Sequence, residues 1–164
     1  MTAMKIRHEV TYDAGVDEVY AMLADPDFRQ KSLDAMGVVS ADVKIDQGGD
    51  GMTVIVDQVQ RTEGIPSFAK KFAGETTRAV QTEEWPDHTG ATLVVTTPGK
   101  PSTITGRITL TADGASTVQA FDGEAKVKVP LIGGKLEGLV ADLFRDGRDK
   151  EHAVGVAWLA GERT

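Results

Sequence analysis

The sequence predicts an α+β fold in which an antiparallel sheet of about seven strands carries a long C-terminal helix. From residue 38 to residue 129, apolar residues recur mainly at every second position, in segments separated by turns, which is typical of consecutive antiparallel strands. Between residues 136 and 158 the spacing along one face changes to three and four, which predicts a helix. We therefore expect a sheet on which the last helix lies.

The N-terminal segment predicts one strand and two short helices. Residues 5–12 alternate between apolar and polar side chains, as in a half-buried strand. An apolar stripe with helical spacing follows over residues 16–23, with acidic residues in the first turn, where the helix dipole favours negative charge. Pro26 ends this helix and can begin a second one, because proline is tolerated at a first helical position but not inside a helix. Gly37 ends the second helix.

The strands of the sheet are expected at residues 39–45, 52–56, 75–85, 91–96, 103–110 and 118–129. A glycine-rich turn over residues 47–51 joins the first two as a hairpin. In the last strand Val118 and Ala120 are in one phase and Phe121 is in the other, which predicts a bulge near Ala120. Residues 64–74 are bracketed by glycines and too short for a full helix, so we expect a separate turn or lid there.

Composition disfavours several classes of function. The formal net charge of −7 would repel a phosphate backbone, so we expect no binding to nucleic acid. The absence of cysteine excludes disulfides, thiolate nucleophiles and cysteine-ligated metals. The histidines His8, His88 and His152 are far apart and lack metal-ligand spacing, and Gly133-Gly134-Lys135 lacks the rest of a phosphate-binding loop, so we expect no metal and no cofactor.

The length of 164 residues predicts one domain, over residues 1–164. The N-terminus has no long apolar run after its charges, and no window approaches the about 18 apolar residues of a membrane span. We therefore expect a soluble, cytoplasmic protein.

The order of elements and several local segments resemble a known superfamily. Residues 10–28, the opening strand and helix pair, are similar to the start of the START-like, or SRPBCC, helix-grip superfamily, which includes the birch-pollen allergen, START lipid-binding domains and aromatic polyketide cyclases. The lid from Ile65 to Phe72 and the ending at residues 129–137 most resemble a bacterial family of uncharacterised function. The resemblance covers nearly the whole chain. It implies a curved sheet wrapped around the last helix and a hydrophobic cavity between them, but it implies no catalytic residue.

The resemblance makes a non-enzymatic protein that binds a lipid or other hydrophobic small molecule our first hypothesis. Small residues on the inner face of the sheet, Gly106, Gly123 and Ala125, would leave room for such a molecule. We expect the cavity to be lined by His8, Leu23, Val54, Phe68, Phe72, Leu93, Val95, Ile108, Phe121, Ala125, Leu136, Leu139, Val140, Leu143 and Phe144.

Two other functions stay open. A cyclase or dehydratase acting in the same cavity would require at least two of four acid-base candidates, His8, Tyr12, Asp146 and Glu151, to converge on one pocket. An adaptor would bind another protein through its sheet or lid. The sequence does not predict the ligand or the oligomeric state.

Two segments permit opposite interpretations. Phe68 and Phe72, with two lysines between them, could gate the cavity or make a transient membrane contact, or they could only cover one end of the sheet. The charged stretch from Arg145 to His152 could line a polar part of the cavity, with Asp146 and Glu151 facing inward, or it could overhang the sheet in solvent. The cost of burying an unpaired carboxylate favours the overhang.

Overall fold

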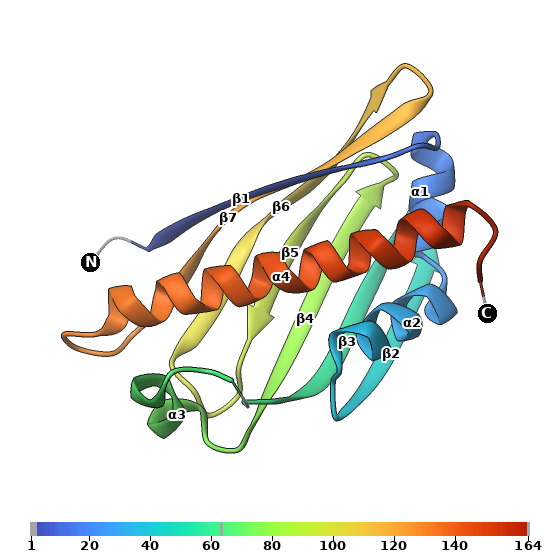
Figure 1. Ribbon diagram of the computed structural model, residues 1–164. Coiled ribbons are helices and arrows are strands. Elements are labelled where there is room, and N and C mark those ends of the chain that lie inside the picture. The colour runs from blue at the N-terminus through green and yellow to red at the C-terminus, as the bar shows by residue number, and fades with distance from the viewer. Residues whose placement is uncertain (1–2, 63, 164) are drawn as a thin grey trace.

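The computed structural model describes residues 3–62 and 64–163, which form one seven-stranded antiparallel sheet and four helices (Figure 1). The longest helix, α4, crosses the inner face of the sheet obliquely, and α3 lies at one end of the sheet below it in this view. In chain order the elements are β1 (Met4–Tyr12), α1 (Val16–Leu23), α2 (Pro26–Met36), β2 (Ser40–Gly48), β3 (Gly51–Arg61), α3 (Ser67–Ala73), β4 (Thr76–Asp87), β5 (Gly90–Thr96), β6 (Ser102–Asp113), β7 (Ser116–Val127) and α4 (Gly133–Leu159).

The sheet has the strand order β1-β7-β6-β5-β4-β3-β2. Consecutive strands from β2 to β7 pair as a meander, whereas β1 pairs with β7, from Met4 opposite Ala125 to Tyr12 opposite Thr117. The helix pair α1 and α2 connects β1 at one edge to β2 at the other, and α2 packs against α4. The predicted α+β fold, with a sheet of seven strands around a long C-terminal helix, is confirmed.

The second helix begins and ends as its sequence predicts. The Asp25 carboxylate caps it by accepting a hydrogen bond from the Asp27 amide at 2.9 Å, and Pro26 occupies the first turn. Gly37 ends the helix in the left-handed conformation, with φ of 74°. Phe28 then meets Trp158 of α4 edge to face, with ring centroids 5.7 Å apart. These contacts fix the C-terminal half of α4 against the helix pair.

The last strand contains no bulge near Ala120. Its register with β6 is continuous from Ser116 to Val127, so the prediction of a phase change was wrong. The cause is that two polar residues, Thr117 and Gln119, point into the protein and are buried, while Val118 and Ala120 are less buried. A strand with polar residues on its inner side therefore resembled two strands of opposite phase.

The space above the small residues of the sheet is filled. A Cβ atom added to Gly106 would lie 2.5 Å from Cζ of Phe121, and one added to Gly123 would lie 2.6 Å from the same atom. The Phe121 ring thus lies against both glycines, and it packs on Phe144 of α4 with centroids 4.8 Å apart. These glycines permit close packing in the core, and the open space lies elsewhere, toward α3.

Candidate ligand-binding site

A cavity of about 290 Å³ lies between the sheet, α3 and the N-terminal half of α4. This volume is close to the lower end of the range of small-molecule sites, about 300–1,000 Å³. Polar side chains, including Arg61, Thr62 and Lys100, also contribute to its wall. We name this space the apolar cavity. The apolar part of its wall consists mainly of Ile65, Ala69, Phe72, Val95, Ile104, Val127, Leu136, Leu139, Val140, Leu143 and Phe144.

The helix α3 covers one end of the apolar cavity. Its C-terminal end is tied to the residue that follows β3, because the Thr62 hydroxyl donates a hydrogen bond to the Gly74 carbonyl. The Gly74 amide in turn donates to the Lys70 carbonyl at 2.8 Å. Ala69 is buried in a cluster with Val127 and Leu136, so the helix is anchored to both β7 and α4. The segment expected as a turn or lid thus contains one short helix with a buried side.

The predicted cavity residues are divided among four locations. The apolar cavity is lined by Phe72, Val95, Leu136, Leu139, Val140, Leu143 and Phe144. Leu23, Val54, Leu93, Ile108 and Ala125 are fully buried in the core. His8 and Phe121 border a separate small hollow, and Phe68 lies beside the apolar cavity, with the Lys135 ammonium 4.8 Å from its ring centroid.

Three glutamines at the inner end of the apolar cavity were not among the predicted residues. Gln58, Gln60 and Gln81 line it from β3 and β4, and the Gln60 amide donates a hydrogen bond to Gln58 Oε1 at 2.8 Å. The signal in the sequence was their phase: Gln58 follows Val54 and Val56 at alternate positions of one strand, so it had to face inward.

The glutamines connect the apolar cavity to a second hollow of about 90 Å³, named here the polar extension. Both spaces are bordered by Gln58, Gln60, Gln81, Leu143 and Phe144. The polar extension continues to the buried charges Arg29, Arg148 and Glu151. The interior therefore changes from apolar near α3 to charged near α2.

Arg29 and Glu83 form a buried ion pair beside the polar extension. The terminal nitrogens of Arg29 donate to the two Glu83 oxygens at 2.8 and 2.9 Å, and Glu83 also accepts from Gln81 at 2.7 Å and from Trp85 Nε1 at 2.9 Å. Burial alone would raise the pKa of Glu83, but the charge and hydrogen bonds of Arg29 lower that pKa to about 2. Glu83 is therefore an ionised carboxylate, and each of its two oxygens accepts two hydrogen bonds.

The charged stretch of α4 is partly buried. Arg148 and Glu151 are 7 % and 5 % exposed, and their side chains are 3.3 Å apart. The prediction of a solvated overhang was wrong for these two residues, because mutual pairing offsets the cost of burying each charge. Asp146 faces water and pairs with Lys150 at 3.0 Å. One side of this stretch faces the interior and the other faces solvent.

Three of the four acid-base candidates border one very small hollow. His8, Tyr12 and Glu151 line a space of about 10 Å³ together with Gln119 and Arg148. Tyr12 Oη and Gln119 Oε1 are buried there and have no hydrogen-bond partner among the residues that the structure describes. Burial, followed by the negative charge of Glu151, raises the pKa of Tyr12, so its hydroxyl stays protonated. A space of this size is about that of a single water molecule.

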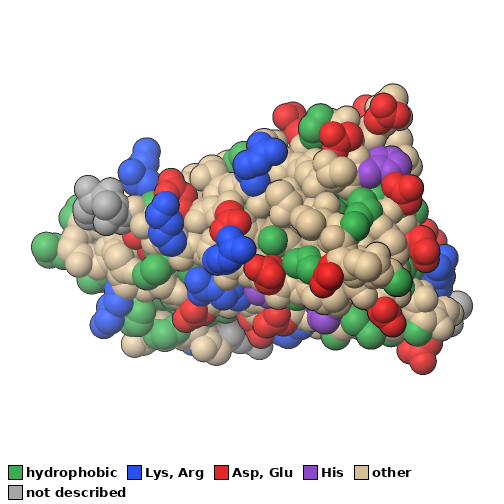
Figure 2. All heavy atoms as spheres, turned by 90° about the horizontal axis from the view of Figure 1, so that it is seen from above, with side chains coloured by type: hydrophobic (Ala, Val, Ile, Leu, Met, Phe, Trp, Pro, Cys, Tyr) green, Lys and Arg blue, Asp and Glu red, His purple; other side chains and the backbone are tan. Residues whose placement is uncertain are grey.

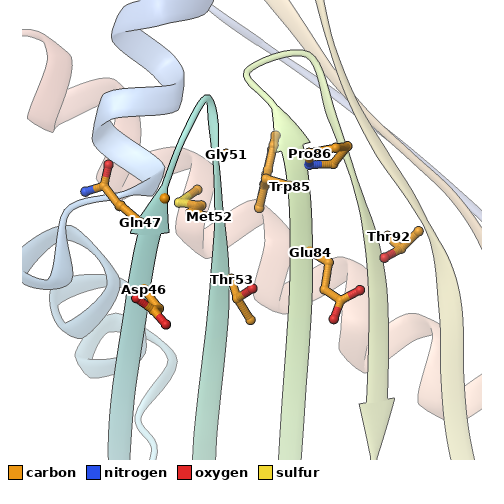
Figure 3. Close-up of a pocket in the computed structure, with 10 residues that line it drawn as sticks. Asp46, Gln47, Gly51, Met52, Thr53, Glu84, Trp85, Pro86 and Thr92 are labelled. Atoms are coloured by element: carbon orange, nitrogen blue, oxygen red, sulfur yellow. The ribbon is translucent and has the colours of Figure 1, made fainter.

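A larger hollow, of about 630 Å³, lies on the other face of the sheet, next to the β2–β3 hairpin. In Figure 3, α4 passes behind the strands that carry this hollow, and Asp46, Glu84 and Thr92 project from them. These three side chains are exposed, so the hollow is an open surface and not an enclosed site. We therefore place the candidate site in the apolar cavity, which is smaller but surrounded by three elements.

Charge is unevenly distributed around the molecule. Figure 2 shows Asp and Glu side chains gathered toward the end that carries α1 and the β6–β7 hairpin in Figure 1, with Lys and Arg mostly toward the other end. Arg61 and Lys100 line the cavity at this second end, and α3 carries Lys70 and Lys71. Four basic side chains thus lie at or near this end of the cavity, in a protein of net charge −7.

The described residues offer no obvious metal site and no membrane-spanning helix. Over residues 3–62 and 64–163, no three His, Asp or Glu side chains gather closely enough to hold an ion. No helix in the same part of the chain is both long and apolar enough to cross a bilayer.

Comparison with solved structures places the fold. The chain is similar to TTHA0849 from Thermus thermophilus, with 19 % identity and a TM-score of 0.66 over 96 % of this chain and 99 % of the other. It is also similar to a START superfamily protein from Mycobacterium smegmatis, with 12 % identity and a TM-score of 0.58 over 94 % and 98 % of the two chains. Norcoclaurine synthase from Thalictrum flavum, in complex with dopamine and hydroxybenzaldehyde, matches with 17 % identity and a TM-score of 0.59 over 99 % and 89 %.

These similarities show the START-like helix-grip fold expected from the sequence. No curated protein matches the sequence. A family model described as "Protein of unknown function (DUF2505)" matches residues 7–159, which is nearly the whole chain. The chain therefore belongs to the DUF2505 family.

Proposed function

We propose that this protein binds a lipid or other apolar small molecule in the apolar cavity and performs no reaction on it. The observation that carries the proposal is the contrast within the interior: the sheet glycines are covered by Phe121, whereas an apolar-walled space of about 290 Å³ stays open beneath α3. Apolar side chains around an open space gain less from packing than a filled core, so such a space suits a ligand.

The same geometry gives less support to a reaction. A cyclase or dehydratase would need acid and base groups beside a space for the substrate. His8, Tyr12 and Glu151 do meet, which is what that alternative requires, but the hollow between them has room for about one water molecule. Because one fold supports both binding proteins and enzymes, the similarity to a synthase does not decide between them.

The way into the cavity is proposed to pass beside α3. Phe68 and Phe72 lie on this short helix with Lys70 and Lys71 between them, and Phe72 reaches the cavity wall. An aromatic side chain flanked by lysines can contact an anionic bilayer, because the ring enters the interface and the ammonium groups attract phosphates. We therefore include a transient membrane contact through Phe68 to Phe72 in the proposal.

The binding proposal is tested with the full chain and a fluorescent apolar probe, N-phenyl-1-naphthylamine. Val95 lines the cavity, whereas its neighbour Val94 is 40 % exposed on the other face of β5. Val95→Trp would place an indole ring in the cavity and is expected to weaken probe binding at least about tenfold, since the added ring cannot be accommodated together with the probe. Val94→Trp, the matched control, should bind the probe like the unmodified protein.

Native mass spectrometry with fatty acids, sterols and quinones identifies the class of ligand, and circular dichroism shows that both variants are folded. The proposal is refuted if neither the fluorescent probe nor any of these compounds binds the unmodified protein. Equal binding by Val94→Trp and Val95→Trp would refute the assignment to this cavity.

A further inference from the structure

We infer that the ligand is elongated and that its inner end carries a neutral hydrogen-bonding group, such as a hydroxyl, ketone or amide, bound by Gln58, Gln81 and Arg148. This inference rests on the proposed function and adds the chemical class of the ligand. It comes from the gradient in the interior, because the apolar cavity and the polar extension share the three glutamines as a common wall. A molecule that entered beside α3 would therefore direct its far end at amide groups.

The glutamines have hydrogen-bonding capacity to offer. Each side-chain amide has two donor hydrogens and an acceptor oxygen. Within the described part of the chain, the hydrogen bonds of these side chains use the oxygen of Gln58, as acceptor from Gln60, and one nitrogen of Gln81, as donor to Glu83. The nitrogen of Gln58 and the oxygen of Gln81 can thus serve a ligand that both accepts and donates.

Arg148 contributes a further donor at the same end. Its guanidinium carries five N–H groups, and it is paired with Glu151 through one contact of 3.3 Å. Arg29, by contrast, already donates from all three of its nitrogens: Nε donates to the Leu23 carbonyl at 2.7 Å, and the two terminal nitrogens donate to Glu83. Of the two arginines that border the polar extension, Arg148 therefore has more donor hydrogens left for a ligand.

The balance of buried charge disfavours an ionised group at this end. Arg29 and Glu83 cancel each other, and so do Arg148 and Glu151, which leaves the surroundings of the polar extension neutral. A ligand carboxylate or ammonium placed there would be an uncompensated buried charge, which is costly. The exposed Arg61 and Lys100 cannot compensate it, because they border the apolar cavity and not the polar extension. A neutral polar group fits both the hydrogen-bonding capacity and the charge.

The test uses decan-1-ol and decanoate as competitors for N-phenyl-1-naphthylamine on the full chain. Gln58→Met keeps the length of the side chain and removes its amide, and it leaves only the exposed Gln60 without a partner, which water can replace. We expect Gln58→Met to raise the dissociation constant of decan-1-ol about tenfold, in keeping with the loss of about one buried hydrogen bond. The dissociation constant of the apolar probe should be unchanged.

Leu139→Met is the matched control, because Leu139 lines the apolar cavity and not the polar extension. It should leave the affinity for decan-1-ol unchanged, and thermal unfolding shows that both variants are folded. The inference is overturned if Gln58→Met and Leu139→Met bind decan-1-ol equally well. It is also overturned if decanoate binds more tightly than decan-1-ol and loses affinity in Gln58→Met, since the inner end would then bind an anion. Failure of the apolar probe and of the fatty acids, sterols and quinones to bind the unmodified protein would instead refute the proposed function.

Discussion

The buried pair of Arg29 and Glu83 gives a prediction whose size follows from the structure. Glu83 is 1 % exposed and accepts four hydrogen bonds, so Glu83→Gln would leave the Arg29 guanidinium buried beside a neutral amide. Removing one member of a buried ion pair costs about 3–5 kcal/mol of unfolding free energy, because the remaining charge has lost its partner. We expect a loss of that order at pH 7.

The pH dependence of this loss provides an independent check. The pKa of Glu83 is lowered in the folded protein from 4.5 to about 2. A lowered folded-state pKa stabilises the protein at pH values above the unfolded pKa, and this stabilisation disappears as the pH falls toward the folded value. At about 1.4 kcal/mol per unit, the pair contributes on the order of 3 kcal/mol at pH 7, of which about 2 kcal/mol is lost by pH 3.

Urea unfolding of the unmodified protein and of Glu83→Gln at pH 7 and pH 3, followed by circular dichroism, measures the unfolding free energy of each. Other carboxylates titrate in both proteins, so the difference between the unmodified protein and Glu83→Gln isolates Glu83. That difference should shrink by about 2 kcal/mol from pH 7 to pH 3. A difference that stays constant over this range, or one below about 1 kcal/mol at pH 7, would refute the reasoning.

Two further predictions concern Tyr12 and Phe68. Tyr12→Phe removes a buried hydroxyl that has no hydrogen-bond partner within residues 3–62 and 64–163, so the unfolding free energy in urea should stay the same or rise by up to about 1 kcal/mol. A loss above about 1.5 kcal/mol would show that the hydroxyl has a bound partner, such as a water molecule. Phe68→Ser should reduce sedimentation with vesicles of anionic phospholipid. It should leave binding of N-phenyl-1-naphthylamine unchanged, because Phe68 lies beside the apolar cavity and is not one of the side chains that line it. Equal sedimentation of both proteins would contradict a membrane contact through this side chain.

Local sequence signals predicted the fold well. Pro26 and Gly37 delimit α2 through restrictions on single residues, and such restrictions act the same way in any surroundings. The alternation in β1 through β6 and the helical spacing of α4 also reflect which side is buried. These features depend on residues close together in sequence.

The site was harder to predict because its position depends on contacts between distant segments. The inner phase of a strand can be read from alternation, but whether Leu93 or Val95 meets open space depends on where α3 and α4 lie above it. The burial of Arg148 depends on Glu151 one turn later, and that of Glu83 on Arg29 in another element. The cost of burying a single charge, taken for each residue alone, predicts solvent exposure. In the structure the paired charges are buried.

The pairing of β1 with β7 has a consequence for how the chain folds. Met4 must find Ala125, so β1 leaves the ribosome long before the strand with which it pairs. At about 5–20 residues per second, β1 waits on the order of ten seconds for its partner. Contacts so distant in sequence also raise the contact order and slow folding. During this interval β1 has charged side chains at alternate positions, Lys5, Arg7 and Glu9. These charges disfavour pairing with a strand of another chain.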